Sequence, residues 1–273
     1  MKINKLIASA LMAMTIVGLS GCNKFLDKTP LDANSDATNW TSEASLQTYS
    51  WNLYGDFDSF AYGSGWTRGR YHSDVLCDDY TADSFNEFTK NVPTASGSWT
   101  TPYERIRKAS VLLARVDKVP NLSAEAANHR KGVARFFRAL GYRTLVLLYG
   151  DVPLQIEEVK TPKTDYTRES KEKVWAQVVE DLEYAVANLP EINAVKDGEI
   201  SKPAANMLLA EVYLATNAND KAITASSAVI GNSNLKLMTQ RFGSQANEDG
   251  DVFYDLFRPN NQNRASGNTE GES

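Results

Sequence analysis

The sequence predicts a mostly α-helical protein in which paired helices form an irregular repeat scaffold with long loops. Three observations predict this fold class. Apolar residues recur at intervals of three and four over several long stretches. Serine, threonine, proline and glycine stand at the ends of those stretches, where they cap or stop helices. Short turns separate several stretches, which indicates that successive helices pack as antiparallel pairs.

The first 21 residues have the pattern of a leader peptide rather than of the fold. Lys2 and Lys5 precede an apolar run from Leu6 to Val17, which is too short to span a bilayer as a stable helix. The run ends at Leu19-Ser20-Gly21-Cys22, which resembles the lipobox of bacterial lipoproteins. That resemblance implies cleavage before Cys22 and anchoring in lipid through its acylated thiol and amine. The alternative is an ordinary secretory peptide with a cysteine near its cleavage site.

Composition argues against a nucleic-acid partner and against a disulfide framework. The formal net charge is −5, and no stretch forms a basic stripe. After the leader, no stretch is long and apolar enough to cross a membrane. If Cys22 carries lipid, Cys77 has no partner for a disulfide, because the chain has two cysteines. We expect Cys77 to be a small buried or half-buried side chain.

A tether, one helix and a long loop are predicted ahead of the main helical part. Residues 22–40 are polar and rich in turn residues, so we expect them to form the lipidated tether. Residues 58–98 contain glycines, a proline and scattered aromatics, which predicts a loop insertion. A loop of that length within a compact domain is more often functional than idle. Between these segments a helix is predicted from one apolar face, formed by Leu46, Tyr49, Leu53 and Phe57.

Two long helices are predicted after this loop. Thr101 opens a capping box in which Pro102 suits the first helical position, so a helix is expected to begin there. A second helix is expected from Ser123 to about Tyr149. Ser123 can cap its start, and Gly150 can close its end.

Three further helices are predicted over residues 170–189, 201–214 and 220–230, because apolar or small residues share one face in each. A small-Leu-Ala-x-x-Tyr-Leu pattern near Ala205–Leu214 resembles tetratricopeptide hairpins. The spacing of the helices is irregular and the consensus is only partly present. The sequence therefore predicts a degenerate tetratricopeptide-like scaffold rather than a regular array.

Residues 134–154 combine a helix that is apolar on most sides with a Gly-Asp-x-Pro turn. Such a helix is expected to be buried, so Arg135, Arg138 and Arg143 need polar partners. The segment resembles the signature helix and turn of the SusD/RagB family, outer-membrane lipoproteins of Bacteroidetes that work with a TonB-dependent transporter. Four other motifs resemble the family in the expected order: Cys22–Asp27, Trp99-x3-Tyr103-x2-Ile106, Ser201–Leu214 and Phe253–Phe257.

The resemblance covers nearly all of residues 22–258 and implies a helical domain over residues 41–258. Family members run considerably longer and carry a loop-rich C-terminal portion packed on the helices. The resemblance thus implies that this portion is missing here, in a fragment or a truncated gene product. We expect residues 259–273 to form a polar tail without a core, since Ala265 is their only apolar residue.

No catalytic or cofactor-binding constellation stands out, so we expect neither catalysis nor a cofactor. One acidic cluster has aspartates that suit calcium, but it lacks the glycine of a calcium loop, and a solvated loop is the preferred interpretation. No metal site is therefore predicted. The cluster consists of His72, Asp74, Cys77, Asp78 and Asp79. The other histidine, His129, lies among polar residues and is expected to face solvent.

The family resemblance implies a surface lipoprotein that binds glycans, or peptides, and is anchored in outer-membrane lipid through Cys22. It would deliver its ligand to a SusC-like TonB-dependent transporter and form a lid over the transporter barrel. Two other classes stay open: a tetratricopeptide-like scaffold for envelope proteins, and a lipid-anchored glycan hydrolase. An aromatic-rich cleft favours the first class, a groove between helix faces the second, and two opposed carboxylates the third.

Residues 58–98 contain side chains that suit a sugar: flat aromatic rings for its C–H faces, and charged or amide groups for its hydroxyls. For each aromatic, an equally good interpretation is that it fixes the long loop to the helices. The candidate ligand-binding residues are Trp66, Arg68, Arg70, Tyr71, Asp74, Asp78, Tyr80 and Asn86.

Overall fold

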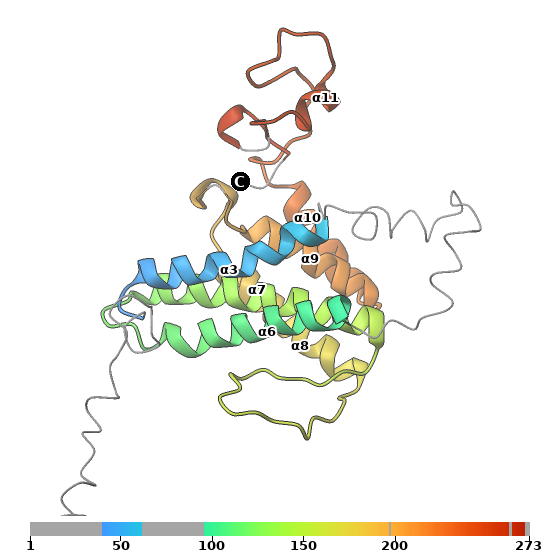
Figure 1. Cartoon of the computed structure of the whole chain (residues 1–273). Helices are drawn as coiled ribbons and strands as arrows, with labels where there is room; N and C mark the ends of the chain where they lie inside the picture. The colour runs from blue at the N-terminus through green and yellow to red at the C-terminus, as the bar shows by residue number, and fades with distance from the viewer. Residues whose placement is uncertain (1–39, 62–95, 197, 262–263, 271–273) are drawn as a thin grey trace, which may run out of the picture. The chain divides into compact units, whose positions relative to one another are not determined.

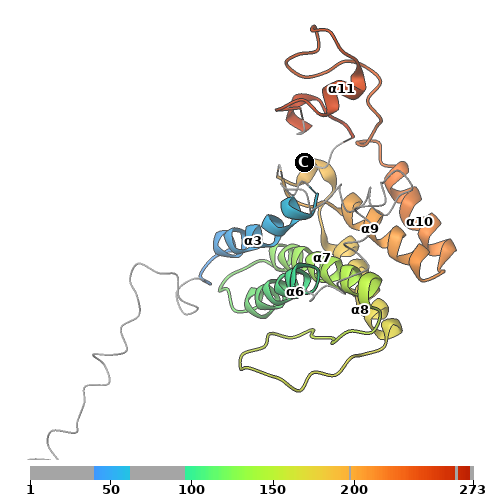
Figure 2. The same cartoon turned by 45° about the vertical axis from the view of Figure 1, so that its right-hand side comes forward.

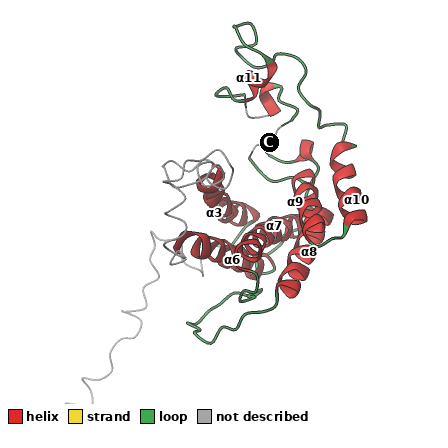
Figure 3. Ribbon diagram, turned by 90° about the vertical axis from the view of Figure 1, so that its right-hand side faces the viewer, coloured by secondary structure: helices red, strands yellow, loops and turns green. Residues whose placement is uncertain are grey.

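A computed structural model describes residues 40–61, 96–196, 198–261 and 264–270 (Figure 1). Helices account for the regular structure in these ranges, and Figure 3 shows no strand among them. One isolated antiparallel bridge joins Val152 and Glu169. The helices are α3 (Glu43–Ala61), α6 (Ser96–Val116), α7 (Ala124–Tyr149), α8 (Lys171–Asn188), α9 (Lys202–Ala215), α10 (Asn219–Ile230) and α11 (Val252–Leu256), with 3-10 turns η1 (Ile192–Ala194) and η2 (Arg264–Ser266).

Successive helices pack as neighbours from α6 to α10, and α3 packs against both α6 and α7. Figures 1 and 2 show α3 lying along this helical layer, with α9 and α10 forming a pair at its end. The arrangement confirms the predicted mostly helical, degenerate tetratricopeptide-like scaffold. Long connections interrupt it, among them those between α7 and α8 and between α10 and α11.

The core lies between α3, α6, α7, α8 and α9, and α7 contributes the largest share of it. Gly141 on α7 lets α6 approach closely. A Cβ atom at this position would lie 2.8 Å from Ile106 Cγ1 and 3.0 Å from the Pro102 carbonyl oxygen. The largest side chains with almost no exposed surface are Tyr142, Phe137, Leu46, Leu53, Ile106, Leu112, Leu145, Leu182 and Ile192.

Local capping signals in the sequence set several helix boundaries. The hydroxyls of Ser123, Ser170 and Ser201 each accept a hydrogen bond from a backbone N–H in the first turn of the helix that follows. Gly150 ends α7 with a φ of +69°, a left-handed conformation that glycine adopts without strain. The predicted boundaries of α7, α8, α9 and α10 are thus confirmed to within a residue or two.

The predicted start at Thr101 is wrong, because α6 begins at Ser96 and carries Pro102 inside it. The added first turns are stabilised by packing. The Trp99 ring lies 4.9 Å from the Tyr149 ring on α7 and 5.1 Å from the Tyr103 ring, measured between centroids. These contacts offset the backbone hydrogen bond that proline cannot donate. Helix α3 likewise continues to Ala61, beyond its last predicted apolar residue.

Candidate functional site

The residues predicted to bind ligand all fall outside the described part of the chain. They are Trp66, Arg68, Arg70, Tyr71, Asp74, Asp78, Tyr80 and Asn86. The proposed lipidation site Cys22 and the acidic cluster around His72 also lie outside it. What the structure does describe is the base of the segment 62–95: α3 precedes it, α6 follows it, and these two helices contact each other. The predicted ligand segment therefore begins and ends on neighbouring helices.

Arg135, Arg138 and Arg143, three of the four arginines of α7, have the polar partners that the sequence predicted they would need. Arg138 donates from Nε and Nη2 to the two carboxylate oxygens of Asp181 on α8, both at 2.7 Å. Both side chains are buried, so the pair fixes α7 against α8 inside the core. Burial raises the pKa of the Asp181 carboxyl, and the hydrogen bonds from Arg138 oppose that rise. Arg135 also reaches Asp181, and Arg143 pairs with Glu211 on α9.

The connection between α7 and α8, residues 150–170, forms a strap whose two ends meet at the bridge between Val152 and Glu169. Side chains of α6 and α7 hold its first half. Tyr103 donates to the Pro153 carbonyl at 2.8 Å, and Arg138 donates to the Ile156 carbonyl at 2.6 Å. Tyr142 donates to the Gln155 carbonyl at 2.8 Å, and burial raises the pKa of this tyrosine to about 12. These bonds fix the path of the first half of the strap beside α6 and α7.

A cleft of about 450 Å³ lies between the strap and α6. One wall is formed by Ser110, Leu113 and Ala114 of α6 together with Lys118 in the turn that follows it. The opposite wall is formed by strap residues Ile156, Glu157, Glu158 and Lys160. The Ser110 hydroxyl oxygen is buried and has no hydrogen-bond partner among the described residues. Two hydrogen bonds from Arg115, of 2.6 and 2.8 Å, engage the Glu158 carboxylate. The cleft thus offers hydrogen-bonding groups for a polar ligand without a pair of opposed, unengaged carboxylates.

A second buried ion pair joins α3, α7 and the turn before α9. Arg130 lies 3.3 Å from Glu199 and 3.6 Å from Glu43, and Gln47 donates to Glu199 at 2.9 Å. His129 lies beside this group, half-buried, which corrects the prediction that it faces solvent. Its Nε2 atom is enclosed without a hydrogen-bond partner among the described residues. Burial, and next the charge of Arg130, lower the pKa of His129.

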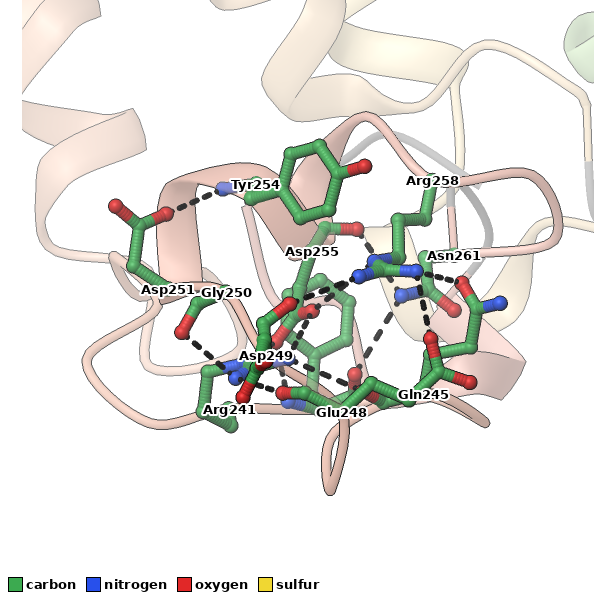
Figure 4. Close-up of polar contacts among 11 residues, drawn as sticks. Arg241, Gln245, Glu248, Asp249, Gly250, Asp251, Tyr254, Asp255, Arg258 and Asn261 are labelled. Atoms are coloured by element: carbon green, nitrogen blue, oxygen red, sulfur yellow. Dashed lines mark hydrogen bonds and ion pairs between the residues drawn. The ribbon is translucent and has the colours of Figure 1, made fainter.

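A third polar group organises residues 236–270, which we call the C-terminal segment (Figure 4). Its Arg241–Asp255 cluster also includes Arg258 and Asn261. Arg241 donates to both carboxylate oxygens of Asp255, at 2.5 and 3.0 Å, and to the carbonyls of Gln245, Glu248 and Gly250. These contacts, led by the Arg241 hydrogen bonds, lower the pKa of Asp255. Asn261 donates to the Asp255 carbonyl at 3.0 Å. No periodic pattern marked this cluster, because its residues lie in irregular turns.

The described residues contain no group of three or more histidine, cysteine or acidic side chains placed to hold a metal ion. Within the same ranges, none of the helices combines the length and the apolar character needed to cross a membrane. The described polar clusters consist of paired, hydrogen-bonded charges. They position helices and loops, and two clefts border the strap in the described part of the chain. The second cleft, of about 770 Å³, is lined by strap residues 153–167 and 169.

Comparison with known proteins gives consistent matches. A SusD-like protein of Bacteroides ovatus is 28% identical over an alignment of 289 positions. The alignment covers 95% of this chain and 48% of the relative. A solved SusD-like protein of Bacteroides fragilis superposes with a TM-score of 0.61 at 19% identity, covering 86% of this chain and 45% of that one. A solved laminarin-binding SusD-like protein gives a TM-score of 0.60 at 22% identity, covering 74% and 47%.

The chain therefore spans about half the length of the curated SusD-like protein from Bacteroides ovatus and of these solved structures. A family model described as starch-binding and associating with the outer membrane, SusD-like, matches residues 24–214. That range contains the signature helix α7, its closing turn and the helices that form the core. Because the match includes well over half of the sequence, this chain belongs to the SusD-like family.

Proposed function

We propose that this protein is a non-catalytic glycan-binding lipoprotein of the outer membrane that hands its ligand to a TonB-dependent transporter. The match of the SusD-like family to residues 24–214 carries this proposal, because that family is described as starch-binding and outer-membrane-associated. A structural neighbour of the same fold is a laminarin-binding protein. Starch and laminarin are both glucose polymers, so we take a glucan as the first ligand class to test.

The ligand site that we propose lies in residues 62–95, between α3 and α6. Its members are Trp66, Arg68, Arg70, Tyr71, Asp74, Asp78, Tyr80 and Asn86. Their residue types supply ring faces for stacking and polar groups for sugar hydroxyls. The contact between α3 and α6 supports this proposal, since it gives both ends of the segment a rigid base.

The membrane attachment and the transporter partner belong to the same proposal. Cys22 follows a leader that resembles those of lipoproteins, and acylation there would place the helical domain beside a transporter. A glycan-capture protein needs such a partner because a large polar ligand cannot cross the membrane unaided. We therefore propose a SusC-like transporter as the partner that receives the ligand.

Affinity electrophoresis through gels containing starch or laminarin tests the glycan part of the proposal. The full chain should be retarded, and Trp66→Ala should weaken binding about tenfold or more, as expected for truncation of a buried aromatic contact. Trp51→Ala is the matched control, because Trp51 is exposed on α3, outside the proposed site. Absence of retardation in every glycan gel would refute glycan binding. Equal weakening by both substitutions would refute the proposed site.

Co-purification from membranes tests the partner and the anchor. The wild-type chain should fractionate with membranes and bring a TonB-dependent transporter with it after detergent extraction. Cys22→Ser should leave the protein outside the membrane fraction while retaining glycan binding, because it removes the attachment and not the ligand site. A Cys22→Ser protein that stays in the membrane fraction contradicts lipid anchoring. If no transporter co-purifies with the wild-type chain, the result supports the alternative that the protein is a scaffold for envelope proteins.

A further inference from the structure

The cleft between α6 and the strap has the size and the fixed walls of a small-molecule site. Its volume of about 450 Å³ lies within the range of ordinary ligand pockets. Arg115 on α6 and Glu158 on the strap join the two walls through hydrogen bonds of 2.6 and 2.8 Å. Arg138 and Tyr142 on α7 hold the strap wall through its backbone carbonyls. Because the walls are already in place, a ligand binds here at a lower entropic cost.

The charged side chains of this cleft leave one positive charge in excess. Arg115 neutralises Glu158. Lys118 and Lys160, on opposite walls, and Glu157 on the strap are exposed. None of these three side chains forms a hydrogen bond or an ion pair with another described residue. Two ammonium groups against one carboxylate leave a single positive charge, and a ligand with one negative charge complements it.

The same cleft also suits a ligand with hydroxyl groups. The Ser110 hydroxyl is buried in the α6 wall and lacks a hydrogen-bond partner among the described residues. A buried polar group without a partner is destabilising, so a ligand hydroxyl that pairs with it relieves that cost. Glu157 can accept hydrogen bonds from further hydroxyls. Leu113, Ala114 and Ile156 line the rest of the cleft with apolar surface that suits the C–H groups of a sugar ring.

We propose that this cleft is a second carbohydrate site, which takes a sugar unit with one negative charge, a uronate or a sulfate ester. Lys118 and Lys160 bind the acidic group, and Ser110 and Glu157 bind hydroxyls. This second site rests on the proposed function, since its ligand is a carbohydrate. Its residues and its sugar class differ from those of the glucan site proposed in residues 62–95, so each site can be tested without the other.

Isothermal titration calorimetry of the full chain tests the ligand class. Galacturonate and sulfated galactose are the charged probes, which distinguish the carboxylate from the sulfate ester, and galactose is their neutral counterpart. At least one charged sugar should bind about tenfold or more tightly than galactose, the gain expected from a hydrogen bond to a charged group. Acetate and inorganic sulfate supply the charge without the sugar.

Three results of this titration overturn the proposal. The first is no binding of either charged sugar, and the second is binding of galactose as tight as that of the charged sugars. The third is binding of acetate or inorganic sulfate as tight as that of the charged sugar, because the cleft then recognises a charge and not a sugar.

A pair of lysine substitutions locates the site. Lys160→Gln should weaken binding of the charged sugar about fivefold, since one of the two ammonium groups is lost. Lys163→Gln is the matched control, because Lys163 is another exposed strap lysine that lines the second cleft and not this one. Equal weakening by both substitutions overturns the assignment to this cleft. Trp66→Ala should leave binding of the charged sugar unchanged, and Lys160→Gln should leave retardation in starch gels unchanged.

Ser110→Ala tests the hydroxyl by two readouts that a merely structural role would not combine. The substitution should weaken binding of the charged sugar about threefold, because one hydrogen bond to the ligand is lost. It should not lower the thermal midpoint of the ligand-free protein, since the hydroxyl has no partner in the described residues. A lower midpoint with unchanged binding overturns the role of Ser110 in the site.

Discussion

In the helical region, residues 40–230, the described buried side chains are mainly apolar and pack between helices. In the C-terminal segment, residues 236–270, three of the four described buried residues are polar: Asp255, Asn261 and Asn268, with Phe242 as the apolar one. Burial of apolar area supplies most of the stability of a folded domain, whereas a satisfied polar cluster mainly specifies geometry. The two regions should therefore respond differently to the same kind of substitution.

The comparison also explains why the two regions use arginine differently. Arg138 and Asp181 lie inside an apolar core, where a lone charge has no access to water. Arg241 lies nearer the surface, and its guanidinium donates hydrogen bonds to the backbone carbonyls of Gln245, Glu248 and Gly250. Removing a partner from the Arg138–Asp181 pair should thus lower the stability of the whole helical region. Removing a partner of Arg241 should disturb only the order of the C-terminal segment.

The largest effect is expected from Asp181→Asn. This substitution preserves the shape of the side chain but leaves the buried Arg138 charge without a counter-charge. The free energy of unfolding, measured by urea titration of the helical circular dichroism signal, should fall by about 3–5 kcal/mol. Glu180→Gln is the control, because Glu180 is an exposed partner of Arg135 and should contribute less than about 1 kcal/mol. A loss at Asp181 as small as at Glu180 would show that the core tolerates the lone charge.

A pair of glycine substitutions sharpens the claim that packing stabilises the helical region. Gly141→Ala should destabilise by about 1–3 kcal/mol, since its Cβ atom would overlap Ile106 and approach the Pro102 carbonyl. In Gly55→Ala on α3, the added Cβ atom meets no atom of the described residues within 4 Å, so the substitution should stabilise by about 0.5–1 kcal/mol through helix propensity. Urea unfolding measures both changes. The same sign for both substitutions would contradict tight packing between α6 and α7.

In the C-terminal segment, Arg241→Lys should act locally. One ammonium group cannot replace the five hydrogen bonds that the guanidinium donates to Asp255 and three carbonyls. Hydrogen exchange over residues 241–256 should accelerate, while the unfolding midpoint of the helices stays in place. Arg143→Lys makes the same change at a partly exposed pair between α7 and α9 and should alter neither. A shift of the helical midpoint by Arg241→Lys would show that the two regions unfold as one unit.

Prediction from the sequence succeeded where a structure depends on neighbours in the chain. Ser123, Ser170 and Ser201 cap helices because the groups they bind lie within three residues. It failed at Thr101, where rings that are distant in sequence, Trp99 and Tyr149, extend α6 beyond its local start signal. The Arg241–Asp255 cluster lay beyond prediction because irregular turns bring it together. The predicted ligand residues, from Trp66 to Asn86, stay a prediction because they lie outside the described ranges.

The smallest effect is expected at His129, a half-buried residue of α7 beside the ion pair of Arg130 and Glu199. Arg130 lies on its own helix, Glu43 and Glu199 face it from other elements, and Glu125 lies one turn earlier. Burial lowers the pKa of His129 in the folded protein, so the unfolded chain binds its proton first as pH falls through about 6.5. The free energy of unfolding should therefore decline between pH 7.5 and pH 5.5, and less steeply in His129→Gln.

Urea unfolding of both proteins at three pH values measures this difference, since carboxylates that titrate in the same range contribute equally to both curves. Parallel curves would mean that His129 exchanges its proton as freely in the folded protein as in the unfolded chain. That result would place the ring in contact with water and restore the original prediction from its polar neighbours. A shallower curve for His129→Gln would show instead that the junction of α3, α7 and the turn before α9 excludes a proton at the edge of its buried ion pair.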